Sequence, residues 1–371
     1  MSRNATKSHR RTAVRLLVAA VLVVSAAACE PPPPGGSASP TAGGTATARA
    51  GSKPGHVFVI NLENKGYEKV WGAGSEAPYL SQTLRSQGVL LSEYYGIAHN
   101  SNPNYLAQIS GQASNAMTRD DCPTYAAFRL TGTDSLGQAE GTGCVYPASV
   151  PTVAGQLSTA GKTWKGYMED MGTPCRHPEL DGKDSSQGAK VGDQYATRHN
   201  PFVYFQAITS SPDCQANVVD YGELAGDLQS VDTTPNLSYI SPNLCNDGHD
   251  DPCVDGSTGG LAAADSWLSQ QVPAILASPA FKQDGMLVIT FDESEGKTEG
   301  PSGLLPGGTA GGRIGALVLS PFTKGGTTSN QPYNHFSLLA SIEDAFSLPR
   351  LGYAGAPGLN SFGTDVFNAG S

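Results

Sequence analysis

The sequence predicts an α/β fold, a three-layer sandwich in which helices cover both faces of a mostly parallel central sheet. Short apolar runs alternate along the chain with longer segments whose apolar residues recur at helical spacing. Such alternation is typical of strands that are joined by crossover helices and buried on both faces. A further observation is that polar residues follow four of the apolar runs, where sheets of this class bind their ligands.

The elements follow in order from these patterns. The predicted strands are short and apolar: 56–62, 163–168, 237–241, 286–291 and 314–319. The predicted helices have the longer period: 78–88, 103–109, 152–160, 261–276 and 336–346.

Residues 1–29 are predicted to be an export signal. A basic region with Arg10, Arg11 and Arg15 precedes an apolar stretch, 16–28, that is too short for a typical membrane span. Small residues before Cys29 resemble a lipobox, in which Cys29 is lipidated and becomes the mature N-terminus. The alternative is an ordinary signal peptidase site. We therefore expect an exported protein, either a surface lipoprotein that meets the membrane through this lipid or a secreted one.

Two further segments follow the predicted signal. Residues 30–54 are rich in Pro, Gly, Ser, Ala and Thr, which predicts a flexible tether. Residues 55–371 are long enough for a single folded catalytic domain with a buried core.

The cysteines predict disulfides. Setting Cys29 aside leaves six of the seven cysteines, an even number that favours disulfides in an exported chain. Six cysteines allow about fifteen pairings, and no Cys-x-x-Cys spacing points to a metal site. We favour pairs of sequence neighbours because each flanks a stretch rich in Gly, Ser or Asp: Cys122 with Cys144, Cys175 with Cys214, and Cys245 with Cys253.

The charge balance limits the partners. Residues 1–29 hold five Lys/Arg and no Asp/Glu, which leaves 18 basic and 33 acidic residues, a net charge of −15, in the rest of the chain. This argues against a nucleic-acid partner, which favours a basic face. An anionic substrate would need local positive charge, such as a metal ion, to bind against this field.

One run places a hydroxyl at a predicted helix start: His99-Asn100-Ser101-Asn102-Pro103-Asn104-Tyr105. Pro103 suits the first turn, and Ser101 or Asn102 suits the cap before it. A Ser there faces unpaired N–H groups and the positive end of the helix dipole, which favour a phosphate. Ser101 is therefore a candidate nucleophile for phosphoryl transfer, and an ordinary helix cap is the alternative.

Oxygen ligands at two strand ends could hold a cation. Glu63 and Asn64 follow strand 56–62, and Asp292 and Glu293 follow strand 286–291. Carboxylate and amide oxygens suit Ca²⁺, Mg²⁺ or Mn²⁺, and Zn²⁺ is also a candidate. Such an ion would activate Ser101 if that hydroxyl joined the set. Four histidines are available to bind phosphoryl oxygens or move protons: His99, His199, His249 and His335.

Six motifs occur in one order along the chain: Leu62-Glu63-Asn64, His99 to Tyr105, Arg198-His199-Asn200-Pro201-Phe202, Asp247-Gly248-His249-Asp250, Thr290-Phe291-Asp292-Glu293 and Asn334-His335-Phe336-Ser337. Together they resemble the phosphoesterase family of acid phosphatases and phospholipases C, within the alkaline phosphatase superfamily. The chain is most similar to small secreted bacterial acid phosphatases, some of which act on phosphatidylinositol 3-phosphate.

The resemblance implies an alkaline-phosphatase-like fold and a metal-dependent phosphomonoesterase that forms a phosphoserine on Ser101. The substrates would be small phosphorylated molecules or phospholipid head groups. The implied metal ligands are Glu63, Asn64, Ser101, Asp292 and Glu293. The implied phosphate pocket is lined by His99, Asn104, His199, His249, Asp250 and His335, and His249 would protonate the leaving group.

The chain departs from the family pattern at three places. Asn100 replaces a usual Pro, and Asn334 stands where many members have Asp. After Asp292-Glu293, the segment 294–297 lacks the His that follows in phospholipases C. This favours a phosphomonoesterase over a phospholipase C-like phosphodiesterase, and a lipoprotein that binds phosphate without chemistry is the third alternative.

Overall fold

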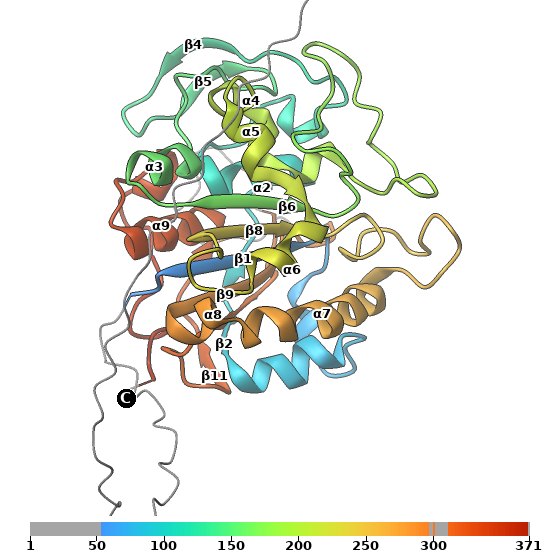
Figure 1. Ribbon diagram of the computed structural model, residues 1–371, viewed down its shortest axis with the longest axis vertical. Helices are drawn as coiled ribbons and strands as arrows, with labels where there is room; N and C mark the ends of the chain where they lie inside the picture. The colour runs from blue at the N-terminus through green and yellow to red at the C-terminus, as the bar shows by residue number, and fades with distance from the viewer. Residues whose placement is uncertain (1–52, 297–299, 301–310, 370–371) are drawn as a thin grey trace, which may run out of the picture. The chain divides into compact units, whose positions relative to one another are not determined.

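An eight-stranded sheet forms the centre of the computed structural model, which describes residues 53–296, 300 and 311–369 (Figure 1). Its strands lie in the order β11 (Thr327–Ser329), β2 (Val89–Leu91), β10 (Ala316–Leu319), β9 (Gly285–Phe291), β1 (His56–Leu62), β8 (Leu237–Ser241), β6 (Trp164–Met168) and β7 (Val218–Asp220). Five neighbouring pairs are parallel, and β10 is antiparallel to both of its neighbours. The predicted, mostly parallel α/β architecture is confirmed.

Strand β1 lies inside the sheet, between β9 and β8. All residues of β1 and β9 are buried, as expected for strands covered on both faces. The register pairs Leu62 with Phe291 at the carboxyl ends of the two strands. The residues that follow, Glu63 and Asp292, therefore start side by side at one edge of the sheet.

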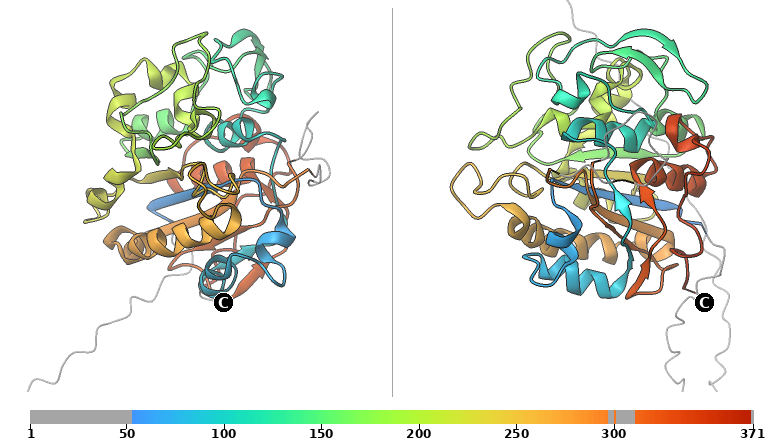
Figure 2. Two further views of the ribbon diagram at one scale, coloured as in Figure 1. Left: turned by 90° about the vertical axis from the view of Figure 1, so that its right-hand side faces the viewer. Right: turned by 180° about the vertical axis from the view of Figure 1, so that it is seen from behind.

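Helices cover both faces of the sheet, as the opposite views in Figures 1 and 2 show. One layer contains α2 (Ser101–Ser110), α3 (Val153–Thr159) and α9 (His335–Phe346). The other contains η1 (Tyr79–Leu84), α7 (Gly260–Ala277) and α8 (Pro279–Asp284). The remaining α-helices are short: α1 (Tyr67–Trp71), α4 (Gln206–Thr209), α5 (Pro212–Asn217) and α6 (Leu224–Asp227).

Small elements complete the described chain. Strand β3 (Tyr94–Tyr95) pairs with β12 (Tyr333–Asn334), and β4 (Arg129–Thr133) forms an antiparallel pair with β5 (Ala139–Thr142). The 3₁₀ turns are η2 (Arg85–Gln87), η3 (Thr118–Asp120), η4 (Thr197–His199), η5 (Pro201–Tyr204), η6 (Tyr221–Glu223) and η7 (Gly352–Gly355).

The predicted strands and helices are present, with corrections. The helix expected over 78–88 is a π-helix, η1, followed by the 3₁₀ turn η2. The strand expected from 314 begins at Ala316, because Gly315 has φ +74°, which is incompatible with the extended backbone of a strand. Strands β2, β7 and β11 were not predicted, since three residues are too few to show a period.

The three predicted disulfides are present: Cys122–Cys144, Cys175–Cys214 and Cys245–Cys253. The last closes a loop that contains Asp247, His249 and Asp250. The predicted signal 1–29 with Cys29, and the tether up to residue 52, lie outside the described residues. Within the described ranges, no helix is long and apolar enough to cross a bilayer.

Removing disulfides should destabilise the protein in the order of the loops they close. Cys175 and Cys214 are 39 residues apart and Cys245 and Cys253 are 8 apart. Loop entropy predicts losses of about 4 and about 2.5 kcal/mol for the respective double Cys→Ser variants. Urea unfolding under non-reducing conditions measures both losses. A larger loss for the shorter loop would contradict this account.

Candidate active site

Two buried carboxylates meet where β1 and β9 end. Glu63 and Asp292 are both inaccessible to solvent. The backbone N–H of Asp292 donates to Leu62 O at 2.8 Å, and the N–H of Asn64 donates to Asp292 Oδ1 at 3.0 Å. The N–H of Glu63 donates to Asp247 O at 2.9 Å, which brings the loop after β8 to the same place. Main-chain contacts thus place this acidic site.

Ser101 is the first residue of α2 and points at these carboxylates. Its Oγ donates to Glu63 Oε2 at 2.8 Å and also lies within hydrogen-bonding reach of Asp292. Asn100 precedes the helix with φ +70°, a conformation that non-glycine residues seldom adopt. The helix therefore starts two residues before the position expected, and Asn100 holds the cap position in place of Ser101 or Asn102.

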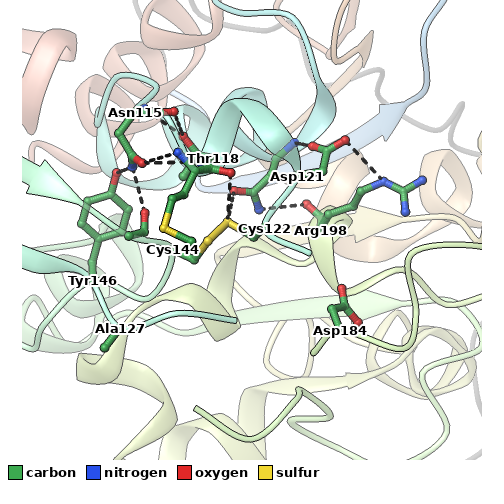
Figure 3. Close-up of a disulfide and its surroundings, with 12 residues drawn as sticks. Asn115, Thr118, Asp121, Cys122, Ala127, Cys144, Tyr146, Asp184 and Arg198 are labelled. Carbon is green, nitrogen blue, oxygen red and sulfur yellow. Dashed lines mark hydrogen bonds and ion pairs between the residues drawn. A yellow bond between two sulfur atoms is a disulfide. The ribbon is translucent and has the colours of Figure 1, made fainter. Parts of the chain in front are cut away.

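A residue from the segment after α2 accepts a hydrogen bond from an N–H group at the N-terminus of this helix. Asp121 Oδ1 accepts the N–H of Asn102 at 2.9 Å, so this N–H does not face a phosphate as we expected. Asp121 also lies 4.0 Å from Arg198 Nε. Figure 3 shows that the Cys122–Cys144 disulfide adjoins both contacts. The disulfide thus ties down the chain beside the candidate nucleophile.

The side-chain amide of Asn64 lies between the carboxylates of Glu63 and Asp292. In one orientation of the Asn64 amide, its oxygen lies 2.9 Å from both Glu63 Oε2 and Asp292 Oδ1. These acceptors repel one another unless a cation lies among them, whereas the reversed amide donates to both carboxylates. Glu63, Asn64, Ser101 and Asp292 therefore fit a divalent ion, which prefers such oxygen donors.

Glu293 and His99 lie beside this group. Glu293 Oε2 is hydrogen-bonded to His99 Nδ1, and the carboxylate also accepts the N–H of Asn100. His99 is thus held against one predicted metal ligand, at the edge of the site. The contact with Asn100 links Glu293 to the residue before Ser101.

A second buried group adjoins Glu63. His199 Nε2 lies 3.3 Å from Glu63 Oε1, and His199 Nδ1 lies 3.3 Å from Asp247 Oδ2. Glu63, His199 and Asp247 form a buried set whose ligand atoms lie within 4.8 Å of one another, and it could hold a metal ion. Tyr105 donates its hydroxyl to Glu63 Oε1 and stacks on His199, with ring centroids 5.1 Å apart.

Sequence reasoning missed the roles of Asp247 and Tyr105. Tyr105 stands four residues after Ser101, and this spacing puts both on one face of a helix. Asp247 follows strand β8 within a motif that we had noted for its neighbours His249 and Asp250. The helical spacing and the position after β8 are the sequence signals that pointed to Tyr105 and Asp247.

Burial controls the acid–base properties of the site. Desolvation raises the pKa of Glu63, Asp247 and Asp292 well above the usual range. Repulsion from neighbouring carboxylates adds to it: from Asp292 and Asp247 on Glu63, from Asp250 on Asp247, and from Glu293 on Asp292. Burial lowers the pKa of His199 well below its usual value. Ionised carboxylates so placed require a compensating cation.

Residues 73–349 match the phosphoesterase family. The chain belongs to this family. A probable acid phosphatase of Kluyveromyces lactis is 28% identical over 80% of the chain and 59% of its own length. A phosphatidylinositol-3-phosphatase of Mycobacterium tuberculosis is 25% identical over 81% of the chain and 79% of its own length. The chain thus spans little more than half of the length of the Kluyveromyces lactis relative.

Solved structures resemble this phosphoesterase in fold. A sulfatase candidate from Bacteroides thetaiotaomicron has a TM-score of 0.50 at 12% identity and covers 85% of the chain and 75% of its own. A protein in the alkaline phosphatase superfamily from Vibrio parahaemolyticus has a TM-score of 0.46 at 11% identity. The match covers 81% of the chain and 68% of that protein. At such identities the likeness concerns the fold alone.

Two residues expected in the phosphate pocket of this phosphoesterase are engaged elsewhere. His335 is fully buried, donates from Nε2 to Asp292 O at 2.6 Å and accepts at Nδ1 from Gln108 and Tyr94. Asn104 is also buried, and its amide bonds the backbone of residues 97, 98 and 100. Both side chains hydrogen-bond to the main chain of the loops around the site.

The other predicted residues lie nearer to solvent or at a helix cap. His249 is partly exposed, and Asp250 Oδ1 lies 2.8 Å from its Nδ1. The ring centroids of His249 and His199 are 6.4 Å apart. Asn334, which differs from many family members, caps α9 by accepting the N–H of Ser337 at 3.1 Å.

His335 should make stability depend on pH in acid. Burial lowers its pKa from 6.5 to about 4, so the unfolded chain binds this proton more readily than the folded one. Its contribution is present above pH 6.5 and is lost as the pH falls to about 4, an effect of about 3 kcal/mol. His335→Gln cannot titrate, so its unfolding free energy should fall less than that of the wild type over this window.

Urea unfolding at several pH values measures this difference. His177→Gln is the control, because His177 is an exposed histidine away from the site, and its curve should parallel the wild type. Parallel curves for His335→Gln and the wild type would contradict the assignment.

Proposed function

We propose that this protein is an exported, metal-dependent phosphomonoesterase of the acid phosphatase type that forms a phosphoserine on Ser101. The observation that carries the proposal is the position of the Ser101 hydroxyl, 2.8 Å from Glu63 Oε2. It stands beside the carboxylates of Glu63 and Asp292 and the side-chain amide of Asn64. A hydroxyl beside the proposed cation ligands is better placed to attack phosphorus than to cap the helix. Asn100 already holds the cap position.

The residues that would hold the ion are Glu63, Asn64, Ser101, Asp292 and Glu293. A divalent cation bound there would lower the pKa of the Ser101 hydroxyl and neutralise charge on the phosphoryl oxygens. The donors suit Ca²⁺, Mg²⁺ or Mn²⁺, and Zn²⁺ also binds oxygen ligands of this kind.

The chain's own residues supply the remaining steps. Ser101 Oγ loses its proton as it attacks phosphorus, and Glu63 Oε2 is the acceptor at hydrogen-bonding distance. The ester oxygen leaves with a proton from His249, whose ring is oriented by Asp250 and reaches solvent. Water then gives a proton to His249 as it attacks the phosphoserine, and the bond between phosphorus and Ser101 Oγ breaks. Ser101 Oγ takes its proton back from Glu63, and phosphate is released. His199 and His99 complete the pocket wall.

The names of the relatives support the substrate class. Acid phosphatases and a phosphatidylinositol-3-phosphatase are among them. We infer that the substrates are small phosphate monoesters, with phosphoinositide head groups included. Three disulfides support a location in an oxidising compartment, in line with export through the segment 1–29 and a lipid on Cys29.

Ser101→Ala should reduce turnover of an aryl phosphate monoester by on the order of 10³-fold or more, because the nucleophile is lost. Steady-state kinetics on the purified protein with added divalent metal measure this, and circular dichroism checks the fold. Ser110→Ala is the matched control, since Ser110 lies on the same helix and bonds Leu106 O within it. Undiminished turnover in Ser101→Ala would refute the phosphoserine step.

A substrate panel separates the alternatives for the wild type. We expect an aryl phosphate monoester to be hydrolysed faster than the matching bis-aryl diester. The reverse preference would favour a phospholipase C-like phosphodiesterase. Tight binding of inorganic phosphate without turnover in any divalent metal would favour a phosphate-binding lipoprotein.

A further inference from the structure

Glu169 is a partly buried carboxylate at the end of β6 that the proposed reaction does not use. Its N–H donates to Ser241 O at 3.0 Å, at the carboxyl end of the neighbouring strand β8. Its Oε2 accepts the N–H of Asn243 at 2.9 Å. Its Oε1 accepts the Asn246 amide at 2.9 Å and Trp267 Nε1 at 3.2 Å. This side chain thus joins β6, the loop after β8 and helix α7.

The loop that Glu169 holds continues to His249. Asn243 Oδ1 accepts the N–H of Asn246 at 2.9 Å, and Asn243 O accepts the N–H of Asp247 at 2.8 Å. Asp247 Oδ1 in turn accepts the N–H of His249 at 2.7 Å. A continuous series of hydrogen bonds therefore runs from the Glu169 carboxylate to the main chain of His249.

The position of the His249 ring depends on this loop. Its Nδ1 lies 2.8 Å from Asp250 Oδ1, and the N–H of Asp250 donates to Leu244 O at 3.0 Å, so these partners belong to the loop itself. The disulfide Cys245–Cys253 closes the loop on itself, whereas Glu169 attaches it to the sheet. A shift of the loop would move the ring and its partner together.

We propose that Glu169 is a positioning residue, which holds the loop 243–250 where His249 can protonate the leaving group. The inference rests on the proposed function, which assigns this proton transfer to His249. A general acid acts only within hydrogen-bonding distance of the leaving oxygen. A displacement of about 1 Å can slow a reaction by about 10²-fold. A residue that fixes the loop therefore affects this step without touching the substrate.

Glu169→Gln isolates this role because it keeps the size of the side chain and replaces one acceptor oxygen by an NH₂ donor. Burial raises the pKa of Glu169, whereas the three hydrogen bonds lower it and favour the carboxylate. In either orientation of the new amide, the NH₂ group faces a donor: the N–H of Asn243, or the side chains of Asn246 and Trp267. The variant therefore loses one attachment of the loop.

Two monoesters with different leaving groups test the proposal. The anion of para-nitrophenol leaves readily without a proton, whereas the alkoxide of ethyl phosphate needs one as it departs. We compare kcat/KM, which reports the steps up to the phosphoserine, for the full chain with saturating divalent metal. Glu169→Gln should lower it by on the order of 10-fold for ethyl phosphate and by less than about threefold for para-nitrophenyl phosphate.

A second variant and a matched control assign the effect. His249→Ala should lower kcat/KM for ethyl phosphate by about 10²-fold or more. Added to it, Glu169→Gln should cause little further loss, because both changes affect one proton transfer. Asp265→Asn is the control, because Asp265 on α7 accepts the N–H groups of Tyr79 and Leu80 at 3.0 and 2.8 Å, outside the loop. It should act equally on both esters.

The outcomes separate the two proposals. Equal losses for both esters in Glu169→Gln, or none, beside a selective loss in His249→Ala would overturn the positioning role and leave the proposed function standing. A lack of selectivity in His249→Ala would overturn its acid role, and the positioning role with it. If Glu169→Gln fails to fold by circular dichroism, Asn246→Asp tests the same contact. It sets a carboxylate oxygen against Glu169 Oε1 and should show the same selective loss.

Discussion

The parallel, in-register pairing of β1 and β9 is the constraint on which the rest of the site depends. It brings Glu63 and Asp292 together at one edge of the sheet, where both are closed to solvent. A main-chain hydrogen bond from Glu63 draws Asp247 to the same point. Gathered carboxylates without water are costly unless cations balance them. The fold therefore places buried negative charge, which a cation can balance, at the edge of the sheet where phosphate chemistry needs positive charge.

The surrounding elements hold Ser101 against this acidic centre. Asn104 fixes the loop before the helix, Asp121 fixes the first turn, and His335 supports the main chain of Asp292 from behind. None of these contacts needs a substrate, so Ser101 and its neighbours are oriented beforehand. Pre-organisation of this kind is what electrostatic catalysis requires of a protein.

The parts of the fold that follow from local pattern were predictable. Strands β1, β8 and β9 were predicted within one residue, and so was the long helix α7, because each shows its period over enough residues. The antiparallel direction of β10 and the three-residue strands were not predicted, since they depend on pairing partners far away in the sequence. The π-helix η1 differs from an α-helix in hydrogen bonding, which apolar spacing does not report.

The sequence by itself determined the element types, the six cysteines that pair, and the acidic residues that stand after strands β1 and β9. Local periodicity, turn chemistry and residue type carry this information. Only the tertiary structure decided that Tyr105 and His199 meet Glu63, and that His335 and Asn104 hydrogen-bond to the main chain around the site. Most of these contacts join segments 42 to 136 residues apart, and no local pattern specifies which of many polar side chains will meet when the sheet and helices pack.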